Sequence, residues 1–403
     1  MENNLSIANS AVFSVCNIAY LPKALALAKS LYANNAIRLK IYIFDRRQEI
    51  NTDFVFAEII WIEDVGLEGL EKYAFKYDIT EFSTSLKPYL ALKLLELHKN
   101  VVFLDPDTFC FSSIQPIFDD LESHAIVLTP HYVTPHEPGD VGMMRFGSFN
   151  LGFFAVSQDE EALRFLKWWN ERCLNLCYFE TQFGLSTDQK WVSIAPCFFP
   201  GIYISFNLGY NVAFWNAHER KIGINNNGDF VVNENYPLIF FHFSSFNEEC
   251  IELLSKRPFV DKEKKRQDLL AVSRIYAEEL SETKKLVPKI AYTFDYMSDG
   301  SYISPSLRRA YASIYDELPE QHDPFDSDGV VGKFAKKNGL YVKDSNYSAM
   351  GFKDKNANLN KIKVVNVIMR LILKVIGPNK FMNLSQLLVF LSSYRLNRDL
   401  WKL

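Results

Sequence analysis

The stretch that decides the fold reads Val101-Val102-Phe103-Leu104-Asp105-Pro106-Asp107-Thr108. Its first four residues form an uninterrupted apolar run, which is typical of a central strand in a parallel sheet covered on both faces. The two aspartates follow directly, and Pro106 between them favours an extended conformation for the residue that precedes it. Because residues two apart in an extended segment point to the same side, we predict that the two carboxylates converge on one point.

Two converging carboxylates are costly unless a cation or a proton is shared between them. Their oxygens suit a hard divalent cation, Mg²⁺ or Mn²⁺, which can also bridge a diphosphate. The plainer interpretation is an ordinary acidic loop after a strand, because Asp-x-Asp alone is a common pattern. The apolar strand before Asp105 favours the metal hypothesis.

Strand and helix signals alternate on both sides of this stretch. Strands are predicted at 12–16, 39–44, 56–62, 125–129, 151–156 and 238–243. Helices are predicted at 21–32, from a cap at Ser85 to about 98, from a capping box at 157–160 to about 173, and from 188 onward. The alternation predicts an α/β fold with a mostly parallel sheet flanked by helices. Ligands bind such sheets at the carboxyl ends of the strands, where Asp105 and Asp107 are expected.

Composition excludes several other classes of protein. The chain has 403 residues, of which 48% are hydrophobic and 15% aromatic, enough for one large or two medium domains. Its net charge of −4 argues against a general nucleic-acid binder, which would be basic. The polar start lacks a signal-peptide pattern, and no apolar run approaches the roughly 20 residues that span a bilayer. Six cysteines without zinc-ribbon spacing indicate reduced thiols, so we expect a cytoplasmic protein.

The character of the sequence changes toward the C-terminus. We predict an α/β domain at 1–247, a helical and loop-rich extension at 248–360, and a basic helical tail at 361–403. The tail carries eight lysines and arginines and one aspartate, a charge of +7, which leaves −11 for the preceding residues. It is either a packed C-terminal element with solvated lysines or an element that lies on an anionic membrane surface.

Three further segments place polar side chains at predicted element ends. Asn150 stands near Gly152 at the start of a strand, Asp188-Gln189 open a helix, and His242 ends a very apolar run. Each has an ordinary explanation when taken alone. Asp188 favours the dipole of its helix, and a lone histidine is more often a hydrogen-bonded core residue than a ligand.

The order of these motifs resembles that of a known family, the GT-A-fold glycosyltransferases, close to glycosyltransferase family 8 and related bacterial sugar transferases. The resemblance covers residues 10–247, with a weaker match at 295–309. It implies a Rossmann-like sheet with a helical C-terminal extension, with 1–247 as the catalytic domain. The motifs that carry it are Asn17-x-x-Tyr20, Ser85-x-Lys87-Pro88, Asp105-Pro106-Asp107-Thr108, Phe149-Asn150-x-Gly152-Phe153, Asp188-Gln189 and Phe241-His242-Phe243.

The resemblance also implies a role for each matching residue. Metal binding falls to Asp105, Asp107 and His242, donor binding to Asn17, Tyr20, Lys87, Asp105 and Asn150, and catalysis to Asp188 and Gln189. The implied cofactor is Mn²⁺ or Mg²⁺, and the implied donor is a nucleotide-diphosphate sugar, above all a UDP-sugar. The implied acceptor is a glycan or a lipid-linked sugar, in bacterial surface polysaccharide or glycoconjugate synthesis. Retention at the anomeric carbon is expected, with attack of the acceptor hydroxyl from the leaving-group face, since no carboxylate nucleophile is evident.

The sequence departs from the family pattern at two places. No lysine follows His242, so a diphosphate contact must come from elsewhere, and the candidates are Lys87, Arg220 and Lys221. The N-terminal motif at Asn17 lacks an acidic residue, which leaves the nucleobase open. The Pro-, Gly- and His-rich segment 131–145 is predicted to act as a lid or acceptor loop.

Two other classes fit parts of the sequence. A phosphatase of the haloacid dehalogenase type would use Asp105 as nucleophile and Asp107 as general acid. It also needs a later acidic pair, which Asp119-Asp120 cannot supply because no strand and crossover fit between them and Asp107. A non-catalytic carbohydrate-binding protein would bind without turnover, and the joint presence of Asp105, Asp107 and His242 speaks against it.

Overall fold

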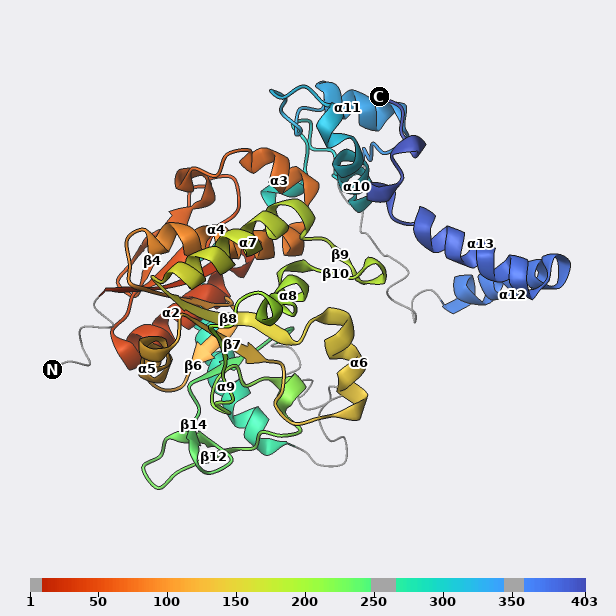
Figure 1. The fold of residues 1–403 in the computed structure, drawn as a ribbon. Helices are drawn as coiled ribbons and strands as arrows, with labels where there is room; N and C mark the ends of the chain where they lie inside the picture. Colours follow the sequence, from red (N-terminus) through yellow and green to blue (C-terminus); the bar gives the residue numbers. More distant parts are fainter. Residues whose placement is uncertain (1–8, 248–265, 344–358) are drawn as a thin grey trace. The chain divides into compact units, whose positions relative to one another are not determined.

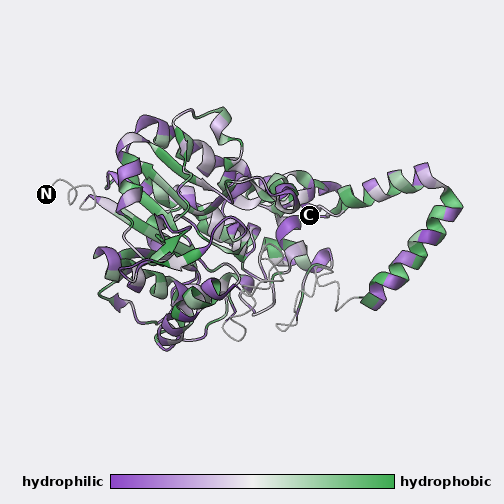
Figure 2. Cartoon of the chain, turned by 90° about the horizontal axis from the view of Figure 1, so that it is seen from below, coloured by the Kyte–Doolittle hydropathy of each residue, from purple (hydrophilic) through white to green (hydrophobic). Residues whose placement is uncertain are grey.

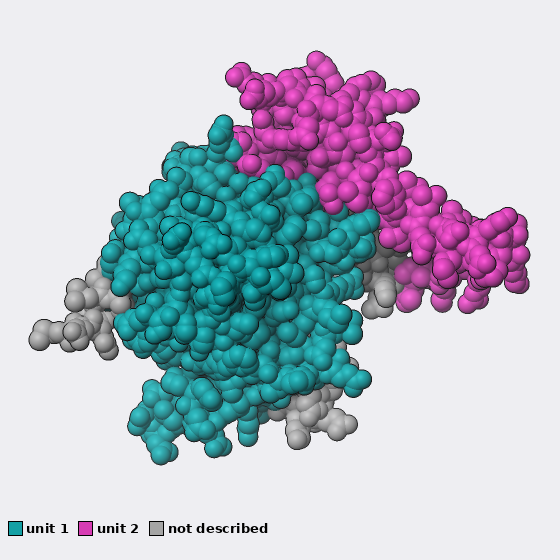
Figure 3. All heavy atoms as spheres, in the orientation of Figure 1, with its two compact units in different colours: residues 1–68, 79–293 teal, residues 69–78, 294–403 magenta. Residues whose placement is uncertain are grey.

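The computed structural model describes residues 9–247, 266–343 and 359–403 (Figure 1). The chain divides into two compact units, one formed by Met1–Glu68 and Ile79–Thr293 and the other by Gly69–Asp78 and Phe294–Leu403 (Figure 3). The predicted boundaries at 247 and 360 border residues 248–265 and 344–358, which lie outside the described residues. The predicted three-part division therefore stays a prediction.

An eight-stranded sheet forms the centre of the first unit, in the order β11-β7-β8-β5-β1-β2-β4-β3. All of its strands run in one direction except β3 and β8, which are antiparallel to their neighbours. This confirms the predicted mostly parallel sheet. The strands are β1 (Ser10–Cys16), β2 (Leu39–Ile43), β3 (Asp53–Phe54), β4 (Ala57–Trp61), β5 (Asn100–Leu104), β7 (Ile126–Pro130), β8 (Phe149–Ser157) and β11 (Ile202–Ile204).

Helices cover both faces of this sheet because its central strands are apolar on both sides. On one face, Val12 and Val102 share a core with α2 (Leu21–Asn35) and α5 (Gln115–Ser123). On the other face, the Phe154 ring of β8 stacks on Phe103 of β5 at 5.3 Å and meets Trp169 edge-on at 5.1 Å. Trp169 belongs to α7 (Glu160–Leu176), which packs beside α4 (Ile79–Leu95).

Shorter elements of the first unit frame the carboxyl edge of the sheet. One antiparallel pair joins β6 to β15, and another joins β9 to β10. A small three-stranded sheet has the order β12-β13-β14. Their bounds, with those of the remaining helices, are β6 (Thr108–Cys110), β9 (Phe179–Glu180), β10 (Leu185–Ser186), β12 (Ile222–Ile224), β13 (Phe230–Val232), β14 (Tyr236–Pro237), β15 (Phe240–His242), α6 (Glu137–Phe146), α8 (Thr187–Val192) and α9 (Gln267–Lys284).

Two predicted helix starts are wrong. Helix α4 begins at Ile79 rather than at Ser85 and runs through Pro88, because the Ser85 hydroxyl donates to the carbonyl of Phe82 (2.8 Å) instead of capping an amide. Helix α7 is capped by Asp159, whose carboxylate accepts from the Glu161 amide (2.8 Å). Ser157, the predicted cap, ends strand β8.

The second unit is organised around the buried guanidinium of Arg308, in α10 (Pro305–Ile314). Its Nη1 donates to the carbonyls of Ala74, Phe75 and Tyr77, and its Nη2 donates to Phe294 O and Asp295 Oδ1. This fork ties the inserted segment 69–78, with α3 (Leu70–Lys76), to the C-terminal part of the unit.

The basic tail forms α12 (Leu359–Ile376) and α13 (Pro378–Leu391), which follow α11 (Val330–Lys337) and break at Gly377, where φ is 79°. The predicted helical tail at 361–403 is thus made of two helices, and short 3-10 turns follow the second helix at 394–396 and 398–400. Neither α12 nor α13 has a buried residue, and apolar and polar residues are interspersed along both (Figure 2). No helix in the described ranges combines the length and the apolar character needed to cross a membrane.

Candidate functional site

The antiparallel direction of β8 brings residues of this strand to the site. Since β8 is antiparallel to β5, its beginning lies at the carboxyl end of β5, and Phe153 pairs with Leu104. The Asp105 amide then donates to the Gly152 carbonyl at 2.8 Å. This pairing brings Asn150, at the start of β8, to the edge of the sheet where the two aspartates lie.

A tight turn and a short strand pair bring His242 to the aspartates. The Thr108 amide and hydroxyl both donate to Asp105 O, at 3.0 and 2.8 Å, which closes the turn around Pro106. Thr108 then pairs with His242 across β6 and β15. His242 Nε2 lies 3.1 Å from Asp107 Oδ1 and 3.7 Å from Asp105 Oδ2. One ligand atom from each of the three residues falls within 4.8 Å of the others.

A hydrogen-bond network fixes the His242 ring. Asn211 Nδ2 donates to Asn150 Oδ1 (3.0 Å) and to Thr129 Oγ1 (3.2 Å), so Asn211 Oδ1 is the acceptor for His242 Nδ1 (3.2 Å). With Nδ1 engaged by Asn211, Nε2 is the ring nitrogen that faces the carboxylates and could bind a metal. The glycine at 152 is required here, because a Cβ would lie 2.3 Å from His242 Cε1.

Lys87 of α4 is the buried cation of the site. Its Nζ lies 3.2 Å from Asp105 Oδ1 and 3.2 Å from Asp188 Oδ2, and it donates to Leu151 O at 2.8 Å. Two ion pairs and one hydrogen bond to a carbonyl therefore hold the ammonium in place. Burial lowers the pKa of Lys87, but the two carboxylates outweigh burial and hold that pKa above its usual range.

The two aspartates are in different electrostatic surroundings. Burial raises the pKa of Asp105 and outweighs the opposing charges of Lys87 and His242. Burial also raises the pKa of Asp107, but His242, through its charge and hydrogen bond, together with the charge of Lys23, brings that pKa below its ordinary value. Asp107 is therefore the more readily ionised of the pair.

A pocket of about 340 Å³ opens in front of this cluster. One wall is a face of α4 that presents Thr80, Ser83, Thr84 and Lys87, spaced i, i+3, i+4 and i+7. The three hydroxyl side chains were not predicted as site residues, because the helix was predicted to begin only at Ser85. The other described lining residues are Val15, Cys16, Asn17, Tyr20, Phe44, Ile79, Asp105, Pro106, Asp107, Asn150, His242 and Ser244.

The predicted donor-binding residues gather at this pocket. Asn17, Tyr20, Lys87, Asp105 and Asn150 all line it. Asn17 Oδ1 accepts from the Tyr20 amide at 3.2 Å and so shapes the turn after β1, and the Tyr20 side chain is exposed at the mouth. Their contacts with a nucleotide sugar stay predictions.

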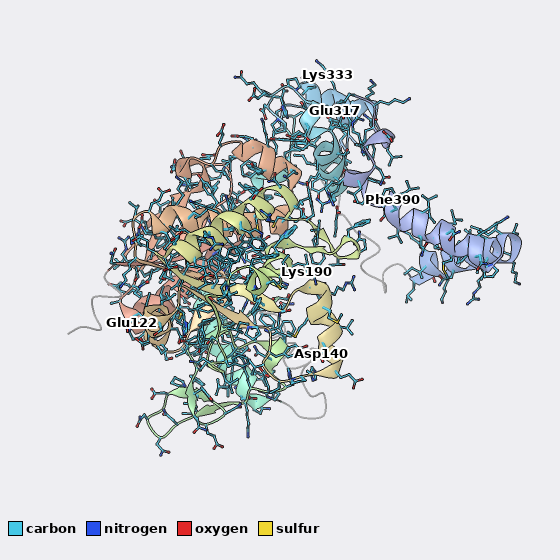
Figure 4. The ribbon with its side chains drawn as sticks, in the orientation of Figure 1. Glu122, Asp140, Lys190, Glu317, Lys333 and Phe390 are labelled. Carbon is cyan, nitrogen blue, oxygen red and sulfur yellow. The ribbon has the colours of Figure 1, made fainter. Side chains whose placement is uncertain are left out.

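The two predicted catalytic residues lie behind the lining. Asp188 is 2% exposed, and its oxygens are held by Lys87 and by the Thr187 hydroxyl (3.1 Å). Gln189 Nε2 donates to Phe146 O (2.9 Å), and the neighbouring Lys190 donates to Met144 O. Gln189 and Lys190 of α8 thus fasten the end of α6, on which Asp140 also lies (Figure 4). The predicted lid role of 131–145 stays a prediction.

Arg220 and Lys221, two of the residues predicted to supply the missing diphosphate contact, do not line the pocket. Arg220 is buried, and its Nη1 donates to the carbonyls of Leu208 and Tyr210 while its Nε pairs with Glu219 (3.3 Å). These contacts of the Arg220 guanidinium are all with the protein itself. Lys221 is exposed and, like Arg220, is absent from the described lining residues.

Comparison with known proteins gives matches over this same region. Residues 63–177 match the family model described as nucleotide-diphospho-sugar transferase. Among curated proteins, YfnD of Bacillus subtilis, an uncharacterized protein, is 27% identical over 226 residues, covering 55% of this chain and 70% of YfnD. YfnF of the same organism, also uncharacterized, is 26% identical over 210 residues, covering 50% of this chain and 68% of YfnF.

Two glycosyltransferases are among the similar solved structures. GlyE of Streptococcus pneumoniae has 18% sequence identity and a TM-score of 0.38; the match covers 69% of this chain and 65% of GlyE, less than two thirds of its length. The galactosyltransferase LgtC, solved with donor and acceptor sugar analogues, has 15% identity and a TM-score of 0.41, over 70% of this chain and 97% of LgtC.

The family match spans α4 with Lys87 and the turn of Asp105-Pro106-Asp107. It therefore covers Asp105 and Asp107, two of the three residues of the cluster with His242, and the wall of the pocket that α4 forms. It also favours the transferase over the phosphatase as the explanation of the Asp-x-Asp turn. Membership of family 8 in particular stays a prediction. Residues 63–177 of the chain are thus similar to the nucleotide-diphospho-sugar transferases, in agreement with the resemblance that the order of its motifs indicates.

Proposed function

We propose that this glycosyltransferase takes its sugar from a nucleoside-diphosphate donor, a UDP-sugar, with the help of Mn²⁺ or Mg²⁺. The acceptor is a glycan or a lipid-linked sugar, in the synthesis of a bacterial surface polysaccharide or glycoconjugate. The observation that carries the proposal is the convergence of Asp105, Asp107 and His242 on one wall of a hydroxyl-rich pocket.

The residues present fit a divalent cation. Two carboxylates lie beside the Nε2 nitrogen of His242, and this arrangement is stable when a cation lies between them. Carboxylate oxygen with one imidazole is a donor set that suits Mn²⁺. A cation bound here neutralises the charge that develops on the diphosphate as the glycosidic bond breaks.

The arrangement of Asp188 supports retention by attack from the leaving-group face. A carboxylate nucleophile must be able to reach the anomeric carbon, but Asp188 is buried and both of its oxygens are engaged. It acts instead as a fixed negative charge behind Lys87. Activity that survives in Gln189→Ala and disappears in Asp105→Ala would support this mechanism, whereas a sugar trapped covalently on Asp188 would refute it.

The first test is a panel of nucleotide sugars incubated with the full chain in Mn²⁺ or in EDTA. We expect one UDP-sugar to release free UDP in Mn²⁺ and none to do so in EDTA, because the leaving group loses its charge stabilisation. The readout is free nucleoside diphosphate. Release that persists in EDTA would contradict the metal dependence. Phosphate release from an aryl phosphate, with no reaction of any nucleotide sugar, would contradict the transferase reaction itself.

We also propose that α12 and α13 bind the anionic inner surface of the bacterial membrane, which would bring a lipid-linked acceptor within reach. Residues 359–391 carry five lysines and arginines and no aspartate or glutamate. Large apolar side chains are exposed along both helices, among them Val364 (60%), Leu371 (57%) and Met382 (61%). Exposed apolar groups interspersed with cations suit an interface with anionic lipid.

Vesicle sedimentation tests this binding with the full chain. We expect binding to phosphatidylglycerol vesicles and at least about a hundredfold weaker binding to neutral phosphatidylcholine, since each of the five cations contributes about 1 kcal/mol near the surface. Replacing Lys363, Arg370 and Lys374 by glutamate should abolish the difference. Lys333→Glu on α11, an exposed lysine of the same unit, is the control and should change little (Figure 4). Equal binding of the triple variant and the wild type would exclude this surface.

A further inference from the structure

The charges around the pocket are not balanced for a nucleoside diphosphate. Asp105, Asp107 and Asp188 supply three carboxylates, and Lys87 is the single lysine or arginine among the described lining residues. A divalent cation compensates the remaining two negative charges. A nucleoside-diphosphate sugar then adds two more, so the site needs a further cation close to the diphosphate.

Lys87 cannot supply that charge without giving up its present partners. Its ammonium is ion-paired with Asp105 and Asp188 and donates a hydrogen bond to Leu151 O. Turning one of them toward a phosphate would leave a buried carboxylate or carbonyl without its donor, which is costly. The lysine that the sequence places in the donor site therefore holds the site together, and a different residue must meet the diphosphate.

Lys23 meets the requirements. It stands in the first turn of α2, where the helix dipole is also positive. Lys23 is not itself among the described lining residues, but its Nζ lies 4.2 Å from the centre of the ring of Tyr20, which is one of them. Within residues 9–247, 266–343 and 359–403, the Lys23 ammonium makes no hydrogen bond and no ion pair.

The geometry points to Lys23 as the residue that binds the donor diphosphate, beside the cation that Asp105, Asp107 and His242 would hold. The assignment rests on the proposed function. In it, Tyr20 holds the Lys23 side chain at the pocket mouth by a cation–π contact, which costs little to release. The flexible four-carbon stem then carries the ammonium to the phosphate oxygens as a point charge.

Titration calorimetry with inorganic pyrophosphate tests this assignment without reference to base, sugar or turnover. In saturating Mn²⁺, Lys23→Met should weaken pyrophosphate binding roughly 10- to 100-fold, and Lys23→Arg should stay within a few-fold of the wild type. Lys99→Met, a lysine at the amino end of β5 and away from the pocket, is the matched control and should bind as the wild type does.

Binding of Mn²⁺ alone separates a direct contact from a structural role. A cation beside Asp107 opposes metal binding, so Lys23→Met should keep or slightly raise the affinity for Mn²⁺. Loss of Mn²⁺ and pyrophosphate affinity together would show a collapsed site and overturn the assignment, as would unchanged pyrophosphate binding. If the wild type itself binds Mn²⁺ but no pyrophosphate, the proposed donor class fails and the role of Lys23 fails with it.

Discussion

Replacing Asp107 by alanine should reduce Mn²⁺-dependent release of nucleoside diphosphate about a thousandfold or more. Asp107 is the more readily ionised of the two aspartates, and its Oδ1 lies 3.1 Å from His242 Nε2. Without it, two ligands remain, and the charge stabilisation that a bound metal gives to the leaving group is worth several kcal/mol. Each 1.36 kcal/mol in the barrier is a factor of ten in rate.

The fold should survive this change. Asp107→Ala removes one of two close carboxylates and leaves the Lys87 ion pairs in place, so the free energy of unfolding should not fall. Asp119→Ala, an exposed aspartate on α5, is the control and should leave both quantities unchanged. The measurement is the rate of nucleoside-diphosphate release in Mn²⁺ and in EDTA. Wild-type activity of the Asp107→Ala protein in Mn²⁺ would contradict the role of Asp107 in binding the metal.

Replacing Lys87 by methionine should lower the free energy of unfolding by about 3–5 kcal/mol. Its side chain is only 5% exposed, and its removal leaves Asp105 and Asp188 as buried charges without their cation. Urea unfolding followed by circular dichroism measures the loss. Lys93→Met is the matched control on the same helix, because its pair with Glu96 is exposed and worth about 0–1 kcal/mol.

A double variant shows whether the cost comes from the uncompensated charge. In Lys87→Met with Asp188→Asn, one of the stranded carboxylates is replaced by a neutral amide. The double variant should therefore be more stable than the sum of the two single losses, by a coupling of about 0.5–3 kcal/mol. A Lys87→Met protein as stable as Lys93→Met would show that the buried pairs do not support the fold.

The parts of the fold that depend on local pattern could be predicted from the sequence. The apolar run before Asp105 gives β5 and the turn that follows it, and the strand–helix alternation gives the covered sheet. The start of α4 could not be found, because serine and threonine favour caps in general, while here their hydroxyls bond back inside the helix. The direction of β8 could not be predicted from the sequence either, because a buried apolar strand has the same pattern of residues in a parallel and in an antiparallel pairing.

The part of the candidate site that lies at the ends of apolar strands could be predicted from the local sequence. Asp105, Asp107 and His242 stand at strand ends, and the structure brings them together. Asn211 and Lys23 were missed because their importance comes only from long-range packing, against His242 in one case and at the mouth of the pocket in the other. The spacing of Thr80, Ser83, Thr84 and Lys87 was visible in the sequence, and a helix begun at Ile79 would have shown it as one face.

The polar network around β8 also bears on how faithfully the chain folds. From Leu151 to Val156 the strand is buried on both faces and mostly apolar, so hydrophobic burial alone would accept a pairing slipped by one residue. What distinguishes the native pairing is the space that Gly152 leaves for His242 and the bond between Asn150 and Asn211. The groups that form the site thus also set the strand register. A chain in which β8 pairs out of register would keep a compact core and lose the arrangement of the site residues. Selection for activity is therefore also selection against molecules that are stable but misfolded.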